Sequence, residues 1–179
     1  MLARIVELPQ DLRRLLGRDE RILWVGKPKK TPFVLKSIGV IILIVPFMII
    51  PTLALSLTSL EIVFNPIILL FFLFWYGMLS LIAVAPFYDF LVWKNIWYVL
   101  TSKGIIVRKG LIGIDYDFLN LENIQQVNVN VGLLDKKYNT GSIVLQSVGV
   151  KPLILWAVEN PYKVQEIIRE AIEEAKDRK

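Results

Sequence analysis

The chain has 179 residues, 55% of them hydrophobic, with a formal net charge of +5 and neither cysteine nor histidine. These two absences exclude disulfides, metal sites ligated by cysteine or histidine, cysteine nucleophiles and histidine general bases. No basic stripe and no RNA-binding aromatic motif points to nucleic acid. The length allows one domain of roughly 90 residues beside membrane-spanning segments.

Residues 1–31 are expected to form an N-terminal cytoplasmic segment, in which no signal peptide is visible. Within this segment, residues 8–17 predict a short helix with three leucines on one face. That face suits either the membrane surface or packing on the later domain. Residues 21–26 predict a short strand, in which Trp24 fits a domain-packing residue as well as an interfacial anchor.

Two uncharged apolar runs follow at residues 37–60 and 62–88, and Glu61 is the only charge between them. A hydrocarbon core about 30 Å thick requires roughly 20 apolar helical residues. Each run is long enough to cross it, so we expect a two-helix transmembrane hairpin over residues 32–88. Its spans are placed near residues 32–50 and 66–88.

The interior of the predicted hairpin contains prolines and aromatic residues but no ionisable side chain. Pro46 is expected to kink the first span and to free a carbonyl, which a neighbouring helix or a Ser/Thr side chain can satisfy. Trp75 and Tyr76 are interpreted as packed between the helices. Intramembrane charges usually mark transport or proton pathways, so their absence from the sequence disfavours a transporter.

Basic residues flank the hairpin and are absent from the loop between its helices. Residues 1–36 hold nine Lys/Arg against four Asp/Glu, and residues 89–179 hold twelve against eleven. The positive-inside rule then predicts a multi-pass cell-membrane protein with both termini in the cytoplasm. Lys27, Lys29 and Lys30 are interpreted either as this topology signal, in contact with the cytoplasmic leaflet, or as an anionic-lipid or phosphoinositide site.

After residue 89 the hydrophobic pattern changes to a period of two, which is typical of strands. Trp93, Trp97 and Tyr98 are expected in an aromatic belt at the membrane–water interface. Gln125 and Gln126 break the alternation and indicate a bulge. The predicted strands cover residues 96–101, 104–109, 115–119, 124–131, 142–147 and 153–158.

The chain is predicted to end in an amphipathic helix that begins after Asn160, at Pro161. Its apolar stripe should cover one open end or edge of a curled sheet, since nothing else would bury that stripe. The stripe consists of Val164, Ile167, Ile168, Ala171 and Ile172.

These segments resemble the second type of bacterial pleckstrin-homology (PH)-like domain, found in membrane-flanked bacterial and archaeal proteins. The resemblance covers about residues 20–172 and is carried by residues 20–28, 98–101, 103–110, 123–127, 132–134 and 141–144. It implies an α+β cytoplasmic domain over residues 89–179, with a PH-like curled antiparallel sheet or barrel capped by the C-terminal helix. It also implies assembly into ring-like or multi-subunit scaffolds, and its motifs contain no catalytic signature.

The sequence departs from the family pattern at two places. Gln126 stands where the family often has Ser, and the Asp-Lys-Lys-Tyr run at residues 135–138 stands where an Arg-containing run is common. Lys136 and Lys137 in this run are predicted to lie in a loop, either as a polar hairpin tip or in contact with anionic lipid or a partner.

Eukaryotic PH domains bind phosphoinositides through a basic loop between their first two strands. By position, Lys103, Arg108 and Lys109 are the analogues here, and their side chains suit phosphate. Three bases spread over alternating faces form no concentrated patch, so a solvated strand edge near the membrane is the alternative. Asp115 and Asp117 share one strand face, but nothing supplies the six oxygens of a calcium site, and no metal or cofactor is expected.

The sequence therefore favours a two-span membrane protein whose PH-like domain is a non-catalytic assembly or interaction module. Its expected partners are membrane lipid and either further copies of itself or another membrane protein. The alternative function is an anionic-lipid sensor that combines the bases between residues 27 and 36 with Lys103, Arg108 and Lys109. No small-molecule substrate is evident, and an enzyme or transporter is disfavoured.

Overall fold

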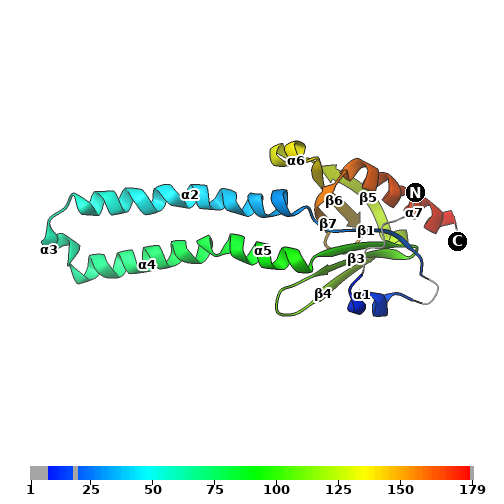
Figure 1. Ribbon diagram of the computed structural model, residues 1–179, viewed down its shortest axis with the longest axis horizontal. Coiled ribbons are helices and arrows are strands. Elements are labelled where there is room, and N and C mark those ends of the chain that lie inside the picture. Colours follow the sequence, from blue (N-terminus) through cyan, green and yellow to red (C-terminus); the bar gives the residue numbers. More distant parts are fainter. Residues whose placement is uncertain (1–7, 18–19, 178–179) are drawn as a thin grey trace. The chain divides into compact units, whose positions relative to one another are not determined.

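The computed structural model describes residues 8–17 and 20–177. Contacts divide the chain into two units. One unit combines Met1–Phe33 with Val92–Lys179, and the other is Val34–Leu91. The strands all belong to the first unit, and the apolar helices form the second (Figure 1).

The first unit contains two antiparallel sheets. The first sheet has the order β1 (Ile22–Gly26), β2 (Trp97–Thr101), β3 (Gly104–Lys109) and β4 (Asp115–Asn120). The second has the order β5 (Ile124–Asn130), β6 (Thr140–Ser147) and β7 (Leu153–Glu159). The predicted bulge is confirmed, since the β5–β6 register shifts between Ile124 and Gln126.

The predicted antiparallel architecture is confirmed, but the barrel alternative is wrong. The short 3₁₀ helix η1 (Leu121–Asn123) separates β4 from β5, which lie in different sheets. The strand ladder thus stops where the chain turns from one sheet to the other, and within residues 8–17 and 20–177 no continuous ladder closes the sheets into a barrel.

The C-terminal helix α7 (Pro161–Asp177) covers the core between the sheets, as its stripe predicts. It contacts β5, β6, β1 and η1, and Figure 1 shows it beside the second sheet. Val164, Ile168 and Ile172 are buried, and Ile167 packs at the edge of the core. Asn160 precedes the helix in a left-handed conformation (φ 49°), and its side-chain oxygen accepts from Asn139.

The N-terminal helix α1 (Gln10–Leu15) packs on the first sheet, which resolves the alternatives left by the sequence. Leu12 is 1% exposed and lies against Val99 of β2 and Ile106 of β3. Trp24 is likewise a packing residue, at the margin of the main core. The first sheet is therefore covered by the core on one face and by α1 on part of the other.

The apolar helices are inserted between the first two strands of the first sheet. β1 precedes them in sequence and β2 follows them, and these strands pair from Ile22↔Thr101 to Gly26↔Tyr98. The strand predicted at residues 21–26 thus belongs to the same sheet as strands from the C-terminal half. In chain order, the connection between the first two strands is the segment 27–96.

The first apolar helix is longer than the sequence predicts, and the second predicted span is divided between two helices. α2 (Lys30–Ser56) runs through both Pro46 and Pro51, and α3 (Leu60–Val63) lies in the connection. α4 (Pro66–Ala83) and α5 (Ala85–Asn95) follow one another. Two helical stretches, Lys30–Ser56 and Pro66–Asn95, are long and apolar enough to cross a membrane.

Polar contacts between α2 and α4 occur at the aromatic residues that we expect between the helices. Pro51 has no N–H to donate to the carbonyl of Phe47, four residues earlier. The indole Nε1 of Trp75 donates to that carbonyl at 3.2 Å. The hydroxyl of Tyr76 donates to the carbonyl of Met48 at 3.3 Å. The neighbouring helix thus satisfies the carbonyl that Pro51 leaves free, whereas the sequence predicts this rescue for Pro46.

Candidate functional site

The candidate site is the end of the first sheet where the chain leaves β1 and returns to β2. We call this the exit end and define it by residues 27–30 and 93–96. Trp93 donates from Nε1 to the carbonyl of Pro28 at 2.7 Å, and Lys27 donates from Nζ to the carbonyl of Lys94 at 3.2 Å. The outgoing and returning connections are thus fastened to each other.

Lys27 lies among aromatic rings at the exit end. Its Nζ is 4.1 Å from the ring centroid of Trp97 and 6.0 Å from that of Trp93, distances at which a cation is attracted to an aromatic face. Lys30 is 5.6 Å from the ring centroid of Trp93. Partial burial, and to a smaller extent the charge of Arg108, lower the pKa of Lys27 below its usual value.

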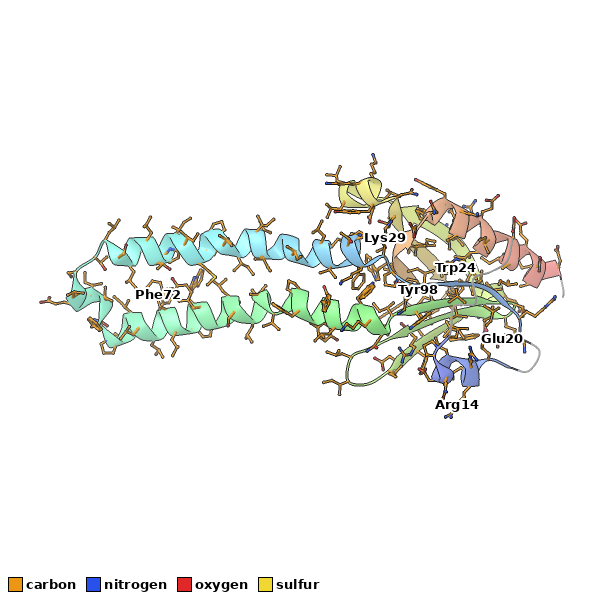
Figure 2. The ribbon with its side chains drawn as sticks, viewed as in Figure 1. Arg14, Glu20, Trp24, Lys29, Phe72 and Tyr98 are labelled. Atoms are coloured by element: carbon orange, nitrogen blue, oxygen red, sulfur yellow. The ribbon has the colours of Figure 1, made fainter. Side chains whose placement is uncertain are left out.

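Lys29 joins the exit end to the second sheet. Its backbone N–H donates to the carbonyl of Ala157 in β7 at 2.8 Å. Its Nζ lies 3.0 Å from a carboxylate oxygen of Glu159 and 3.2 Å from the carbonyl of Tyr138. Figure 2 labels Lys29 beside the strands of the domain. This lysine is therefore engaged within the domain.

Arg108 is also engaged within the domain, although the sequence suggests it as a phosphate contact. Its guanidinium is largely buried and lies 2.7 Å from a carboxylate oxygen of Asp11 in α1, while Nη1 donates to the carbonyl of Asn95 at 2.8 Å. Tyr116 donates its hydroxyl to the same carboxylate. Hydrogen bonding from Tyr116, followed by Arg108, lowers the pKa of Asp11, and Asp11 raises the pKa of Tyr116.

The structure does not bring the three predicted headgroup residues together. Lys103 lies in the β2–β3 turn, whereas Arg108 and Lys109 lie at the other end of β3, roughly 16–20 Å away at the usual rise per strand residue. Because β1 is the first strand, the turn at Lys103 connects the second and third strands. Lys109 forms an ion pair of 2.5 Å with Asp117.

Lys136 and Lys137 lie in a helix, and the predicted loop is wrong. They are exposed residues of α6 (Leu133–Tyr138). The carboxylate of Asp135 accepts from the N–H of Gly132 at 3.0 Å and from the Thr140 hydroxyl at 3.1 Å. These bonds hold the start of the helix against the strand that follows it.

Tyr98 forms a bridge between the sheets, where the sequence predicts an interfacial aromatic residue. It is 1% exposed, so its assignment to an aromatic belt is wrong. Its hydroxyl accepts from the N–H of Trp156 at 3.0 Å and donates to the carbonyl of Trp156 at 3.1 Å. Burial raises the pKa of Tyr98. The run at residues 96–100 is apolar at every position, so no alternation in the sequence marks Tyr98 as inward-facing or indicates its partner.

A groove of about 210 Å³ opens beside this bridge, lined mainly by apolar residues that include Ile96, Val107 and Trp156. Its charged lining residues, Lys109 and Asp117, are paired with each other. Within residues 8–17 and 20–177, no three His, Cys, Asp or Glu side chains are grouped so as to hold a metal ion.

The sequence matches the model of the family described as "Bacterial PH domain" over residues 22–172. The chain belongs to this family. No curated protein and no solved structure matches it. The family match begins at β1 and ends in α7, so it includes the strand that precedes the apolar helices. PH domains are generally non-catalytic interaction modules, and the membership carries this general character but no particular ligand.

Proposed function

We propose that the protein is a two-span membrane protein that presents its PH domain on the cytoplasmic side as a non-catalytic interaction module. The module assembles with further copies of the protein or with a membrane-protein partner. The observation that carries the proposal is the exposure of most large apolar side chains of the inserted helices.

The membrane part of the proposal rests on apolar surface that water would not tolerate. A helix of 27 residues is about 40 Å long, which exceeds the hydrocarbon thickness of about 30 Å. Contiguous apolar patches on soluble proteins rarely exceed a few hundred Å², whereas exposed side chains occur along the length of both helices. Examples are Ile42, Leu43, Phe47, Ile50, Leu53, Leu70, Leu73 and Phe74. The bases at Lys27, Lys29, Lys30 and Lys36 support a cytoplasmic domain.

The interaction part of the proposal rests on the free edge of the first sheet. β4 lies at the end of the strand order, with β3 as its neighbour. It contains neither Lys nor Pro, which commonly protect edge strands. Phe118 on this strand is 53% exposed. An edge strand that lacks Lys and Pro and exposes an aromatic residue suits antiparallel pairing with a second copy around a two-fold axis.

The lipid-sensor alternative receives less support from the same geometry. Arg108 faces Asp11, Lys109 faces Asp117 and Lys29 faces Glu159. Binding a phosphate at these groups would require breaking contacts that already exist. Lys27 and Lys30 lie against aromatic rings at the exit end. The other candidate bases belong to two separate elements, with Lys103 in the β2–β3 turn and Lys136 and Lys137 in α6.

Single-cysteine cross-linking in native membranes tests the assembly, because the chain has no cysteine of its own. Phe118→Cys should give covalent dimers with a short thiol-specific cross-linker. Glu170→Cys, on the exposed side of α7, is the matched control and should remain monomeric. A monomeric Phe118→Cys product, together with a monomeric mass for the unmodified protein in native nanodiscs, would contradict self-assembly. Co-purification of another membrane protein in that case would identify the heteromeric form of the proposal.

A further inference from the structure

Two apolar projections extend from the exit end of the PH domain. The first is the β3–β4 turn at residues 110–114, which contains no charge and in which Ile112 is fully exposed. The second is α6, in which Leu133 is 88% exposed. We call these the turn projection and the helix projection. Neither buries its outermost apolar side chain within the protein.

Each projection is hydrogen-bonded to one of the two connections at the exit end. Asn95, on the returning connection, donates from Nδ2 to the carbonyl of Gly110 in the turn projection at 3.0 Å. Lys29, on the outgoing connection, donates to the carbonyl of Tyr138 in the helix projection at 3.2 Å. Both projections are therefore fastened next to the points where the chain enters or leaves the apolar helices.

The direction of the turn projection follows from the strand that carries it. β3 runs from Gly104 toward Lys109, and Arg108 near its end donates to the carbonyl of Asn95. The turn continues this direction past the exit end. Gly110 has a φ of +123°, and a side chain there would meet the carbonyl of Gly113, so the tight turn depends on glycine. The turn therefore presents an apolar tip.

The distance along the chain places the exit end at the outer edge of the lipid headgroups, within reach of a short projection. The charge-free run ends at residue 88, and Asn95 follows seven residues later in α5, or about 10 Å along a helix. The headgroup region on each side of a bilayer is about 5–8 Å thick. Trp93 lies within this stretch, as is typical of interfacial anchors.

We infer that the tips of both projections insert into the cytoplasmic leaflet and hold the PH domain with its exit end against the membrane. Ile112 supplies a purely apolar contact. Leu133 is followed in α6 by the exposed bases Lys136 and Lys137, which suit anionic headgroups beside the inserted side chain. The inference rests on the proposed membrane hairpin and adds a defined orientation of the domain.

Depth-dependent fluorescence quenching of the full chain in nanodiscs tests this orientation. Single cysteines are introduced as Ile112→Cys and Leu133→Cys and carry an environment-sensitive fluorophore. The nanodiscs contain neutral and anionic lipids with brominated acyl chains. Emission at both positions should shift to shorter wavelength and be quenched by the bromine. Leu23→Cys is the matched control, since this exposed leucine lies in β1, near the opposite end of the sheet, and should show neither effect.

A fourth variant separates failure of this inference from failure of the proposed hairpin. Phe72→Cys lies within α4 and should be strongly quenched if the helices span the bilayer. Quenching at residue 72 without quenching at 112 and 133 overturns the orientation and leaves the hairpin intact. Absence of quenching at residue 72 overturns both. A third outcome is a shift of the emission at residues 112 and 133 to shorter wavelength without bromine quenching but with cross-linking to protein. This outcome would assign the projections to a protein interface and would also overturn the inference.

Discussion

Replacement of Tyr98 by phenylalanine tests the bridge between the two sheets. The change removes one oxygen atom and leaves the buried ring, so no side-chain-sized cavity is created. It deletes the bonds of 3.0 and 3.1 Å to the N–H and carbonyl of Trp156. Each such bond contributes about 1 kcal/mol net. For the two bonds together we therefore expect a total loss of about 2 kcal/mol.

Thermal unfolding of the PH domain in nanodisc-embedded protein measures this loss. The PH unit lies between the sizes for which a change of 1 kcal/mol shifts Tm by roughly 4–8 °C and by roughly 2–4 °C. Tyr98→Phe should therefore lower Tm by roughly 8 °C. The amide of Trp156 should exchange faster with deuterium. Tyr162→Phe, at an exposed tyrosine of α7, is the control and should change neither quantity. An unchanged Tm with unchanged Trp156 exchange would refute the bridge.

The same hydroxyl predicts a loss of stability at alkaline pH. Burial raises the pKa of Tyr98 above its usual value of 10.0. The folded domain therefore retains a proton that the unfolded chain releases, and stability falls as pH rises. The contribution of the bridge is fully present below pH 10.0 and decreases above it. The stability difference between the parent and Tyr98→Phe should accordingly shrink above this pH.

Three further substitutions test other parts of the structure. Leu12→Ala removes the buried side chain that holds α1, at a cost of about 2–5 kcal/mol, so trypsin should cleave faster after Arg13 and Arg14. Leu15→Ala, at a half-exposed position, is the control and should leave the cleavage rate unchanged. Equal cleavage rates in the two variants would contradict the docking of α1 on the sheet. Trp75→Phe should destabilise the hairpin by about 1 kcal/mol in an unfolding assay, and this loss should vanish in a Pro51→Ala background, where residue 51 regains an N–H for the carbonyl of Phe47. The same loss of stability in both backgrounds would exclude the bond from Trp75 to that carbonyl. Asp135→Ala should speed amide exchange throughout α6 by leaving the N–H and hydroxyl groups that it accepts from unpaired; unchanged exchange would show that the carboxylate does not hold the helix.

The strands and the C-terminal helix could be predicted because their burial follows a local period. Val127 is buried and Asn128 is exposed, as alternation in β5 requires. Ile168 lies at the centre of the helical stripe and is completely buried. Such patterns report which face of an element meets a core. They hold wherever the partner surface lies in the chain.

The pairing of elements could not be predicted from the same patterns. Nothing in residues 21–26 indicates that β1 pairs with β2 beyond about 70 intervening residues, because strand periodicity does not name a partner. The leucine face of α1 fits a membrane surface and a sheet equally well. The α6 helix depends on the Asp135 carboxylate turning back to Gly132, and a polar run with lysines also resembles a hairpin tip.

The charges of the exit end show why counting bases overestimates a phosphate site. Arg108 is 9% exposed, and a guanidinium buried to this degree requires a compensating partner. That partner, Asp11, comes from α1, which precedes β1 and is held to the sheet by Leu12. Docking of α1 therefore decides how much positive charge Lys27 experiences from Arg108. The charge of Arg108 already lowers the pKa of Lys27. Release of α1 in Leu12→Ala removes Asp11 from Arg108 and should therefore lower the pKa of Lys27 further. A constant pKa of Lys27 would show that Asp11 does not screen the repulsion between Arg108 and Lys27.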